Sequence, residues 1–288
     1  MPAAPIVVSS PTARSGTSLI QRLISSSENG ICYGANAARR LLMLTEFTHT
    51  ECVALQERSE LQSRYLQNLL SGDMNFGSVD LEILGELPKH ALVGALTFFK
   101  QHCDEATKAI EKEIWACRSP KGSFLTIAKA ADFISDLKCI YVYRNVVDTM
   151  RSQKSMGLIR NEDDLASACM EWVRNTDVIA ALNHNNFEQI PAMLLPIKLE
   201  TFLAQKNESI RHLEDFTGLE NIQRAIADSK VNVSEPVSEA DQTPVLSYQK
   251  PAPLTDVELH LIAHLCRDKM AEIYPENSDL LETGMMVQ

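Results

Sequence analysis

The chain has 288 residues, of which 27 are Lys or Arg and 38 are Asp or Glu, so its formal net charge is −11. Its hydrophobic fraction of 45% is sufficient for a folded core, and its 11 glycines and 12 prolines are far fewer than a low-complexity or collagen-like chain contains. The acidic balance opposes broad contact with nucleic acid or with an anionic membrane, because such contact requires Lys and Arg to neutralise phosphates. Any polyanionic ligand must therefore meet a local basic pocket.

The apolar stretches of the chain are short. The longest, residues 91–99, is well below the roughly 20 residues that a transmembrane helix needs. The first residues lack the basic region that precedes the apolar part of a secretory signal, so we expect a cytoplasmic protein. The seven cysteines are odd in number and never form a C-x-x-C pair, which predicts free, mostly buried thiols.

Hydrophobic periodicity predicts strands that alternate with helices along most of the chain. The first elements are a β-branched strand at 5–9, a loop of small residues, and a helix that begins at Thr17. A long, mainly helical segment follows at about 35–112, with breaks at 71–73 and 87–88. Further strands are expected at 113–117, 138–143 and 192–198, and further helices at 124–137, 145–155, 162–182, 208–217 and 255–274.

This alternation predicts an α/β fold of three layers, in which helices cover both faces of a central, mainly parallel sheet. Because the sequence shows no internal repeat and no inter-domain linker, residues 1–288 are expected to form a single domain. The helical segment at about 35–112 is interpreted as an insert that shapes a pocket. Pro196 places the last strand at an edge of the sheet, or lies at the end of the strand. The polar stretch at about 229–253 is interpreted as a mobile active-site loop rather than as a linker.

The first strand leads through small residues into a helix, and such a turn presents backbone N–H groups and the positive end of the helix dipole to an anion. Gly16 permits close approach of the backbone, and the hydroxyls of Thr17 and Ser18 can cap the helix or donate to phosphate oxygens. An ordinary capped turn would have the same composition. Arg14 favours the functional interpretation, because a guanidinium among N–H groups requires an anionic partner.

The turn is not the phosphate loop of an ATP- or GTP-hydrolysing enzyme. The G-x-x-x-x-G-K-[ST] motif requires a Gly where Ser10 or Pro11 stands, and a Lys that the turn lacks. The strand at 138–143 also ends in Arg144, where a magnesium-binding Asp would be needed. Arg144 indicates a second phosphate subsite instead, and Ser152, two helical turns further on, can contact the same anion.

At these positions the sequence resembles the sulfotransferases that use 3′-phosphoadenosine 5′-phosphosulfate (PAPS), especially the branch that includes the tyrosylprotein sulfotransferases and many bacterial small-molecule enzymes. Residues 11–19 (PTARSGTSL) are similar to the family's 5′-phosphosulfate loop, and residues 143–152 (YRNVVDTMRS) are similar to its 3′-phosphate motif. Further similarities lie at 117–120 (CRSP), 197–203 (IKLETFL) and 211–219 (RHLEDFTGL). The resemblance thus extends over nearly the whole chain.

The resemblance implies a P-loop-NTPase-like fold and a metal-independent transfer of sulfonate from PAPS to a hydroxyl or nitrogen of a small-molecule acceptor. It implies a donor site made of Arg14, Ser15, Gly16, Thr17, Ser18, Arg118, Arg144, Ser152, Tyr248 and Lys250. In this site the loop N–H groups would hold the 5′-phosphate, and Arg14 would stabilise charge on the bridging and sulfonate oxygens. Arg144 and Ser152 would hold the 3′-phosphate, and Arg118 would add positive charge near the sulfonate. Tyr248 and Lys250 would close over the donor.

The general base departs from the family pattern. In the tyrosylprotein branch a Gly-Glu pair supplies it, whereas residues 33–36 read YGAN here. The candidates are therefore Glu46 and His49, which lie three apart on one helix face, and His90 at the start of the next long helix. An acceptor acidic or nucleophilic enough to need no strong base is the alternative.

Two other functions stay open at this point. One is a catalytically inactive nucleotide-binding module of the same fold, and the other is an ATP-dependent small-molecule kinase, which would need the missing Lys and Asp. The net charge favours neutral or cationic acceptors over anionic glycans, as in an enzyme of secondary metabolism. His260 and His264 have the spacing of metal ligands on a helix, but no third ligand accompanies them, so no metal site is predicted.

Overall fold

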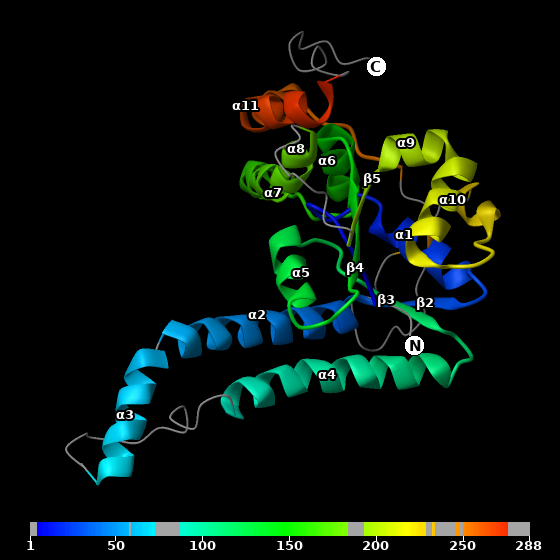
Figure 1. The fold of residues 1–288 in the computed structure, drawn as a ribbon. Helices are drawn as coiled ribbons and strands as arrows, with labels where there is room; N and C mark the ends of the chain where they lie inside the picture. Colours follow the sequence, from blue (N-terminus) through cyan, green and yellow to red (C-terminus); the bar gives the residue numbers. More distant parts are fainter. Residues whose placement is uncertain are drawn as a thin grey trace.

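A five-stranded parallel sheet lies at the centre of the computed structural model (Figure 1), with the strand order β2-β3-β1-β4-β5. The structure describes residues 5–57, 59–72, 87–183, 193–228, 232–233, 246–247 and 250–275. The strands of the sheet are β1 (Ile6–Ser9), β2 (Gly30–Tyr33), β3 (Ile114–Arg118), β4 (Lys138–Tyr143) and β5 (Leu194–Lys198). In the register of the central strands, Val7 lies opposite both Cys117 and Cys139.

Helices connect these strands. They are α1 (Thr17–Ser26), α2 (Ala35–Glu57), α3 (Ser59–Ser71), α4 (Leu87–Lys108), α5 (Phe124–Ala131), α6 (Val146–Ser155), α7 (Glu162–Asn175), α8 (Asp177–Asn183), α9 (Leu199–Ala204), α10 (Lys206–Thr217) and α11 (Asp256–Ile273). A 3-10 helix, η2 (Arg224–Asp228), and a short antiparallel pair, β6 (Asn232–Val233) with β7 (Leu246–Ser247), complete the described elements. The predicted α/β class and mainly parallel sheet are confirmed.

The sheet is buried on both faces, which explains why its strands are almost continuously apolar. All four residues of β1 are buried. Val7 packs on the side of α2, α4, α5, α6, α7, α8 and α11, whereas Ile6 and Val8 pack on the side of α1, α9 and α10. The two cores therefore lie on opposite faces of the sheet, and the loops after β1, β3 and β4 meet at one edge.

The helical insert is built on two long helices. Helices α2 and α4 lie side by side, and α3 lies at their outer end (Figure 1). The hydroxyls of Tyr33 and Thr107 share a hydrogen bond of 2.8 Å, which fixes the C-terminal end of α4 beside the start of α2. The break predicted at 71–73 is confirmed. Helix α4 begins at Leu87, at the second predicted break, and Pro88 lies in its first turn, where proline is tolerated because the helical N–H groups have no partner.

Two elements differ from the expectation. Strand β2 (GICY) was not predicted, because it starts with a glycine and has one β-branched residue, whereas the equally short β1 (IVVS) has three in a row. The helix expected at 162–182 is divided at Thr176, whose hydroxyl donates to the Trp172 carbonyl at 2.8 Å. Pro196 does lie in an edge strand. Most of the stretch at 229–253 lies outside the described residues, so its interpretation as a mobile loop stays a prediction.

No helix among the described ranges combines the length and the apolar character that membrane crossing requires.

A substitution at Gly30, at the start of β2, tests how closely this strand packs against its neighbours. A Cβ at this position would overlap the Leu219 side chain and lie 2.6 Å from Ser27 Oγ. We expect Gly30→Ala to lower the free energy of unfolding by about 1–3 kcal/mol through overpacking, measured by urea denaturation. Gly34→Ala is the matched control, because a Cβ there would meet nothing within 4 Å. Equal losses in the two variants would contradict the packing described for β2.

Candidate functional site

The loop between β1 and α1 is shaped by two left-handed residues. Arg14 has φ 72° and Gly16 has φ 112°, and the buried hydroxyl of Ser15 donates to the Thr12 carbonyl at 2.8 Å. Within the described part of the chain, no side chain caps the N-terminus of α1, and its first turn holds no acidic residue. The first N–H groups of α1 are therefore available to an anion, at the positive end of the helix dipole.

Gly16 is required at this turn for two reasons. Its φ of 112° lies in a region that side chains rarely adopt, and a Cβ would lie 2.9 Å from Leu199 Cδ1 and 3.3 Å from Val142 Cγ1. The loop backbone thus packs directly on α9 and β4. The predicted close approach of a phosphate to the backbone at Gly16 stays a prediction.

Buried polar side chains of α6 and α7 hold the loop from one side. Gln153 Nε2 donates to the Ala13 carbonyl at 2.9 Å and to Thr12 Oγ1 at 3.0 Å. Thr12 Oγ1 in turn donates to Glu171 Oε2 at 2.9 Å, and Asn175 Nδ2 donates to a loop carbonyl at 2.7 Å. Sequence reasoning missed these residues. The sequence did carry a signal for Gln153. It is a polar residue next to Ser152, on a helix whose hydrophobic pattern predicts burial.

Three arginines converge at this edge of the sheet. Arg14 comes from the loop after β1, Arg118 is the last residue of β3, and Arg144 follows β4. Arg14 Nε donates to Ser152 Oγ at 3.2 Å, and Arg118 Nη1 donates to Ser18 Oγ at 3.2 Å. Burial lowers the pKa of the Arg14 guanidinium, and the positive charges of Arg144 and Arg118 lower it further. Arg14 therefore lies within electrostatic range of both Arg144 and Arg118. We call Arg14, Arg118 and Arg144 the arginine cluster.

Arg144 is the member of the arginine cluster whose backbone is most clearly fixed. Its carbonyl accepts a hydrogen bond of 3.1 Å from Trp172 Nε1, and the next N–H, of Asn145, donates to Glu200 Oε1 at 2.8 Å. The half-buried guanidinium itself makes no hydrogen bond or ion pair with any residue that the structure describes. Bringing like charges together in a partly buried site is costly unless an anion binds there. The residues present therefore fit a ligand that carries more than one negative group.

The structure brings together residues that were predicted for two phosphate subsites. Arg14 was assigned to the 5′-phosphosulfate loop and Ser152 to the 3′-phosphate motif, and a hydrogen bond of 3.2 Å joins the two side chains. Arg118 also contacts the start of α1 through Ser18. Tyr248 lies outside the described residues. Lys250 is described and exposed, and its predicted closure over the donor stays a prediction.

The three candidate bases are not brought to the arginine cluster. Glu46 and His49 lie roughly 16 and 21 Å along α2 from its start, at 1.5 Å per residue, where the insert extends away from the sheet (Figure 1). Glu46 instead forms a 2.8 Å ion pair with Lys129 of α5. His90 is exposed at the outer end of α4. These residues became candidates because their side chains can accept a proton. The helices that carry them, however, lead away from the loop.

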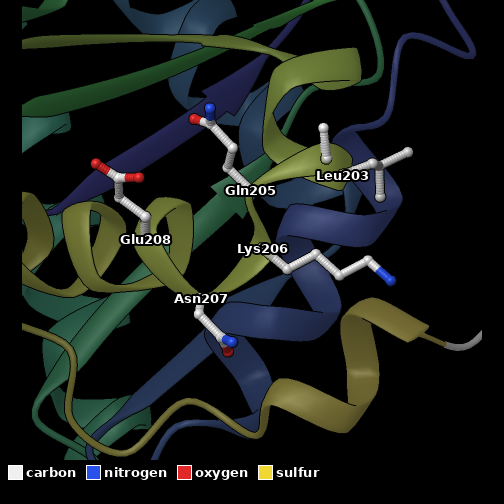
Figure 2. Close-up of a pocket in the computed structure, with 6 residues that line it drawn as sticks. Leu203, Gln205, Lys206, Asn207 and Glu208 are labelled. Carbon is white, nitrogen blue, oxygen red and sulfur yellow. The ribbon is translucent and has the colours of Figure 1, made fainter.

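A hollow of about 480 Å³ lies elsewhere, where α9 meets α10 (Figure 2). Its lining is formed by Leu203, Ala204, Gln205, Lys206, Asn207 and Glu208. Lys206 is paired with Asp228 at 2.5 Å. The hollow contains none of the predicted site residues, and its single cation is already neutralised. The candidate site is therefore the arginine cluster rather than this hollow.

Cysteine and histidine side chains do not form a second centre in the described part of the chain. All seven cysteines are free thiols, and six of them are buried, as predicted. Burial raises the pKa of Cys32 to about 12, although Arg118 acts in the opposite direction. His260 and His264 are both exposed on α11, and the described residues hold no group of three or more His, Cys, Asp or Glu side chains placed to bind a metal.

The sequence matches no protein-family model and no curated protein. Solved structures are similar to this chain at low sequence identity. The sulfotransferase domain of the Synechococcus PCC 7002 olefin synthase is 12% identical, with a TM-score of 0.45, over 91% of this chain and 93% of that chain. The sulfotransferase domain of the curacin biosynthetic pathway is 16% identical, with a TM-score of 0.45, over 92% of this chain and 98% of that chain. Sulfotransferase STF1 from Mycobacterium tuberculosis H37Rv is 11% identical, with a TM-score of 0.40, over 80% of this chain and 72% of that chain.

Arg144→Gln tests whether the arginine cluster is a ligand site. We expect pyrophosphate to raise the melting temperature of the parent protein and to have little effect on the variant, measured by thermal unfolding at constant ionic strength. Without anion, the variant should be at least as stable as the parent, because the repulsion of Arg14 is relieved. Arg211→Gln, on the exposed face of α10, is the control. Equal stabilisation of both variants by pyrophosphate would contradict the assignment.

Proposed function

We propose that this chain is a sulfotransferase that moves a sulfonate group from PAPS to a hydroxyl or nitrogen of a small-molecule acceptor. The observation that carries the proposal is the convergence of Arg14, Arg118 and Arg144 on the turn before α1. This convergence unites the two segments, 11–19 and 143–152, whose sequences resemble the donor-binding motifs of the family. PAPS carries anionic groups at both ends of its ribose, which suits two adjacent cationic subsites.

The charge pattern favours a sulfonate donor over ATP with magnesium. A kinase of this fold type needs a carboxylate at the end of the strand beside the phosphate loop to hold the metal. The strands beside β1 are β3 and β4, of which β3 ends in Arg118 and β4 is followed by Arg144. A guanidinium repels a metal cation and attracts the phosphate itself. In the proposal, fixed arginines and N–H groups therefore take the place of the metal.

In the transfer step, a lone pair of the acceptor oxygen or nitrogen forms a bond to sulfur while the bond between sulfur and the bridging oxygen breaks. The electrons of that bond leave with 3′,5′-adenosine bisphosphate, and the proton of the acceptor passes to solvent water. Charge that develops on the departing oxygens is stabilised by Arg14, Arg118 and the N–H groups at the start of α1. Loss of one such donor typically costs about 3–4 kcal/mol in the barrier.

The proton of the acceptor is not assigned to Glu46, His49 or His90, because none of them reaches the arginine cluster. We propose that the acceptor nucleophile is acidic enough to lose its proton without a strong base. The net charge of −11 favours acceptors that are neutral or cationic. The proposed chemistry is then dominated by stabilisation of the leaving group.

The proposal is tested by calorimetry and turnover. We expect tight binding of 3′,5′-adenosine bisphosphate without metal, and much weaker binding of ATP with magnesium, because the arginine cluster suits two separate anionic groups. Turnover of PAPS with a panel of phenols, alcohols and amines then separates an enzyme from an inactive nucleotide-binding module. Preference for ATP with magnesium would overturn the proposal, and bisphosphate binding without turnover on any acceptor would favour the inactive module.

Substitutions of the former base candidates give an independent check. A general base contributes about 10²–10⁴-fold to a rate. We expect Glu46→Gln, His49→Ala and His90→Ala each to change kcat by less than about tenfold, measured at saturating PAPS and acceptor. A hundredfold loss in any one of them would show that the insert closes on the site during catalysis.

A further inference from the structure

Arg14 has an unusual backbone conformation. Its φ of 72° lies in the left-handed region, which costs energy for a residue that carries a side chain. Such a conformation persists only where the surrounding structure fixes it. To leave it, the chain would have to reorient the peptide plane between Ala13 and Arg14, because φ is the rotation about the bond that joins this plane to the Cα of Arg14.

The side chain of Gln153 holds this peptide plane. Its Nε2 donates to the Ala13 carbonyl, which belongs to the plane, at 2.9 Å. Because a carbonyl oxygen only accepts hydrogen bonds, the nitrogen of the Gln153 amide, and not its oxygen, must face the loop. Gln153 is buried, so water does not readily replace it as a donor. Gln153 therefore opposes the rotation that would release Arg14 from the left-handed region.

The second hydrogen bond of Gln153 belongs to a chain of polar groups. Nε2 also donates to Thr12 Oγ1 at 3.0 Å, and the Thr12 hydroxyl uses its own proton to donate to Glu171 Oε2 at 2.9 Å. The other carboxylate oxygen of Glu171 pairs with Lys121 at 2.8 Å. Each donor in this chain has an acceptor, which fixes the amide of Gln153 in one orientation.

Helix α6 contacts Arg14 at two points. Ser152, which is adjacent to Gln153, accepts a hydrogen bond from Arg14 Nε at 3.2 Å. One helix thus fixes both the guanidinium of Arg14 and the peptide plane before it. We propose that Gln153 is a positioning residue, which keeps Arg14 left-handed so that its guanidinium binds the anion. Its effect on anion binding does not require the proposed function, whereas any effect on sulfonate transfer rests on it.

A double-mutant cycle with pyrophosphate tests this role. We expect Gln153→Met, which keeps the length of the side chain but removes its donors, to raise the dissociation constant of pyrophosphate by about tenfold. In the Arg14→Met background, where Arg118, Arg144 and the loop N–H groups remain, the same substitution should change it by less than about twofold. Calorimetry at constant ionic strength compares the four proteins. Only an action of Gln153 through Arg14 produces this coupling.

Asn29→Leu is the matched control. Asn29 is a buried amide that donates to the Gly218 carbonyl at 3.0 Å. It directly precedes β2 and therefore lies at the opposite edge of the parallel sheet from the arginine cluster. This variant should unfold at a lower urea concentration than the parent, yet bind pyrophosphate with the parent affinity.

Thr12→Val provides a second cycle, because Gln153 is buried and its substitution also affects stability. This variant keeps the shape of the side chain and removes one acceptor of Gln153, while the hydrogen bond to Ala13 remains. We expect pyrophosphate to bind about threefold more weakly, and only when Arg14 is present. Where Gln153→Met does not fold, as judged by circular dichroism, the Thr12→Val cycle decides.

Turnover separates this role from the proposed function. With PAPS and an acceptor, Gln153→Met should lower kcat/KM by about tenfold, again only when Arg14 is present. Coupled pyrophosphate binding without any turnover of PAPS would contradict the proposed function alone. The positioning role would be overturned by additive losses in the deciding cycle, by an unchanged affinity of folded Gln153→Met, or by a parent protein that does not bind pyrophosphate.

Discussion

The repulsion among Arg14, Arg118 and Arg144 is the constraint on which the candidate site depends. Burial and the two neighbouring cations lower the pKa of Arg14, so the folded chain holds these charges together at an energetic cost. The strand order explains how this happens, because β3, β1 and β4 are neighbours and their ends meet at one edge of the sheet. Each strand delivers one guanidinium to the same place, and a bound anion offsets the cost.

Much of the buried polar chemistry on one face of the sheet serves to fix these arginines. The hydroxyl of Tyr141 donates to the Asn175 carbonyl, and the Asn175 amide donates to the Pro11 carbonyl of the loop. Trp172 holds the Arg144 carbonyl, and Glu200 holds the following N–H group. Helices α6 and α7 therefore act on the loop through hydrogen bonds as well as through packing. Pre-organised donors of this kind need little rearrangement when a ligand binds.

The sequence predicted what depends on local pattern. The alternation of apolar strands and amphipathic helices gave the α/β class, and the segments 11–19 and 143–152 gave residues that the fold does bring together. The short β2 escaped detection because it has one β-branched residue, whereas the equally short β1 has three in a row. The division at Thr176 escaped because a residue in a helical pattern can also end a helix by bonding its hydroxyl to the preceding turn.

Residues that act through long-range geometry could not be predicted in the same way. Glu46, His49 and His90 have the chemistry of a base, yet the sequence does not reveal that α2 and α4 extend away from the sheet. Glu171 and Gln153 contact the loop at Thr12, although they are far from it in sequence, and no motif marks them. Loop residues next to a strand end can be assigned from sequence, because the strand fixes their position. Residues on a helix that leaves the sheet can be placed only when the path of that helix is known.

The distribution of charge connects the site to the rest of the molecule. A chain with a net charge of −11 repels anions at long range, so an anionic donor must be held by short-range contacts with the arginine cluster. In the partly buried surroundings of Arg14 such contacts are stronger than in water.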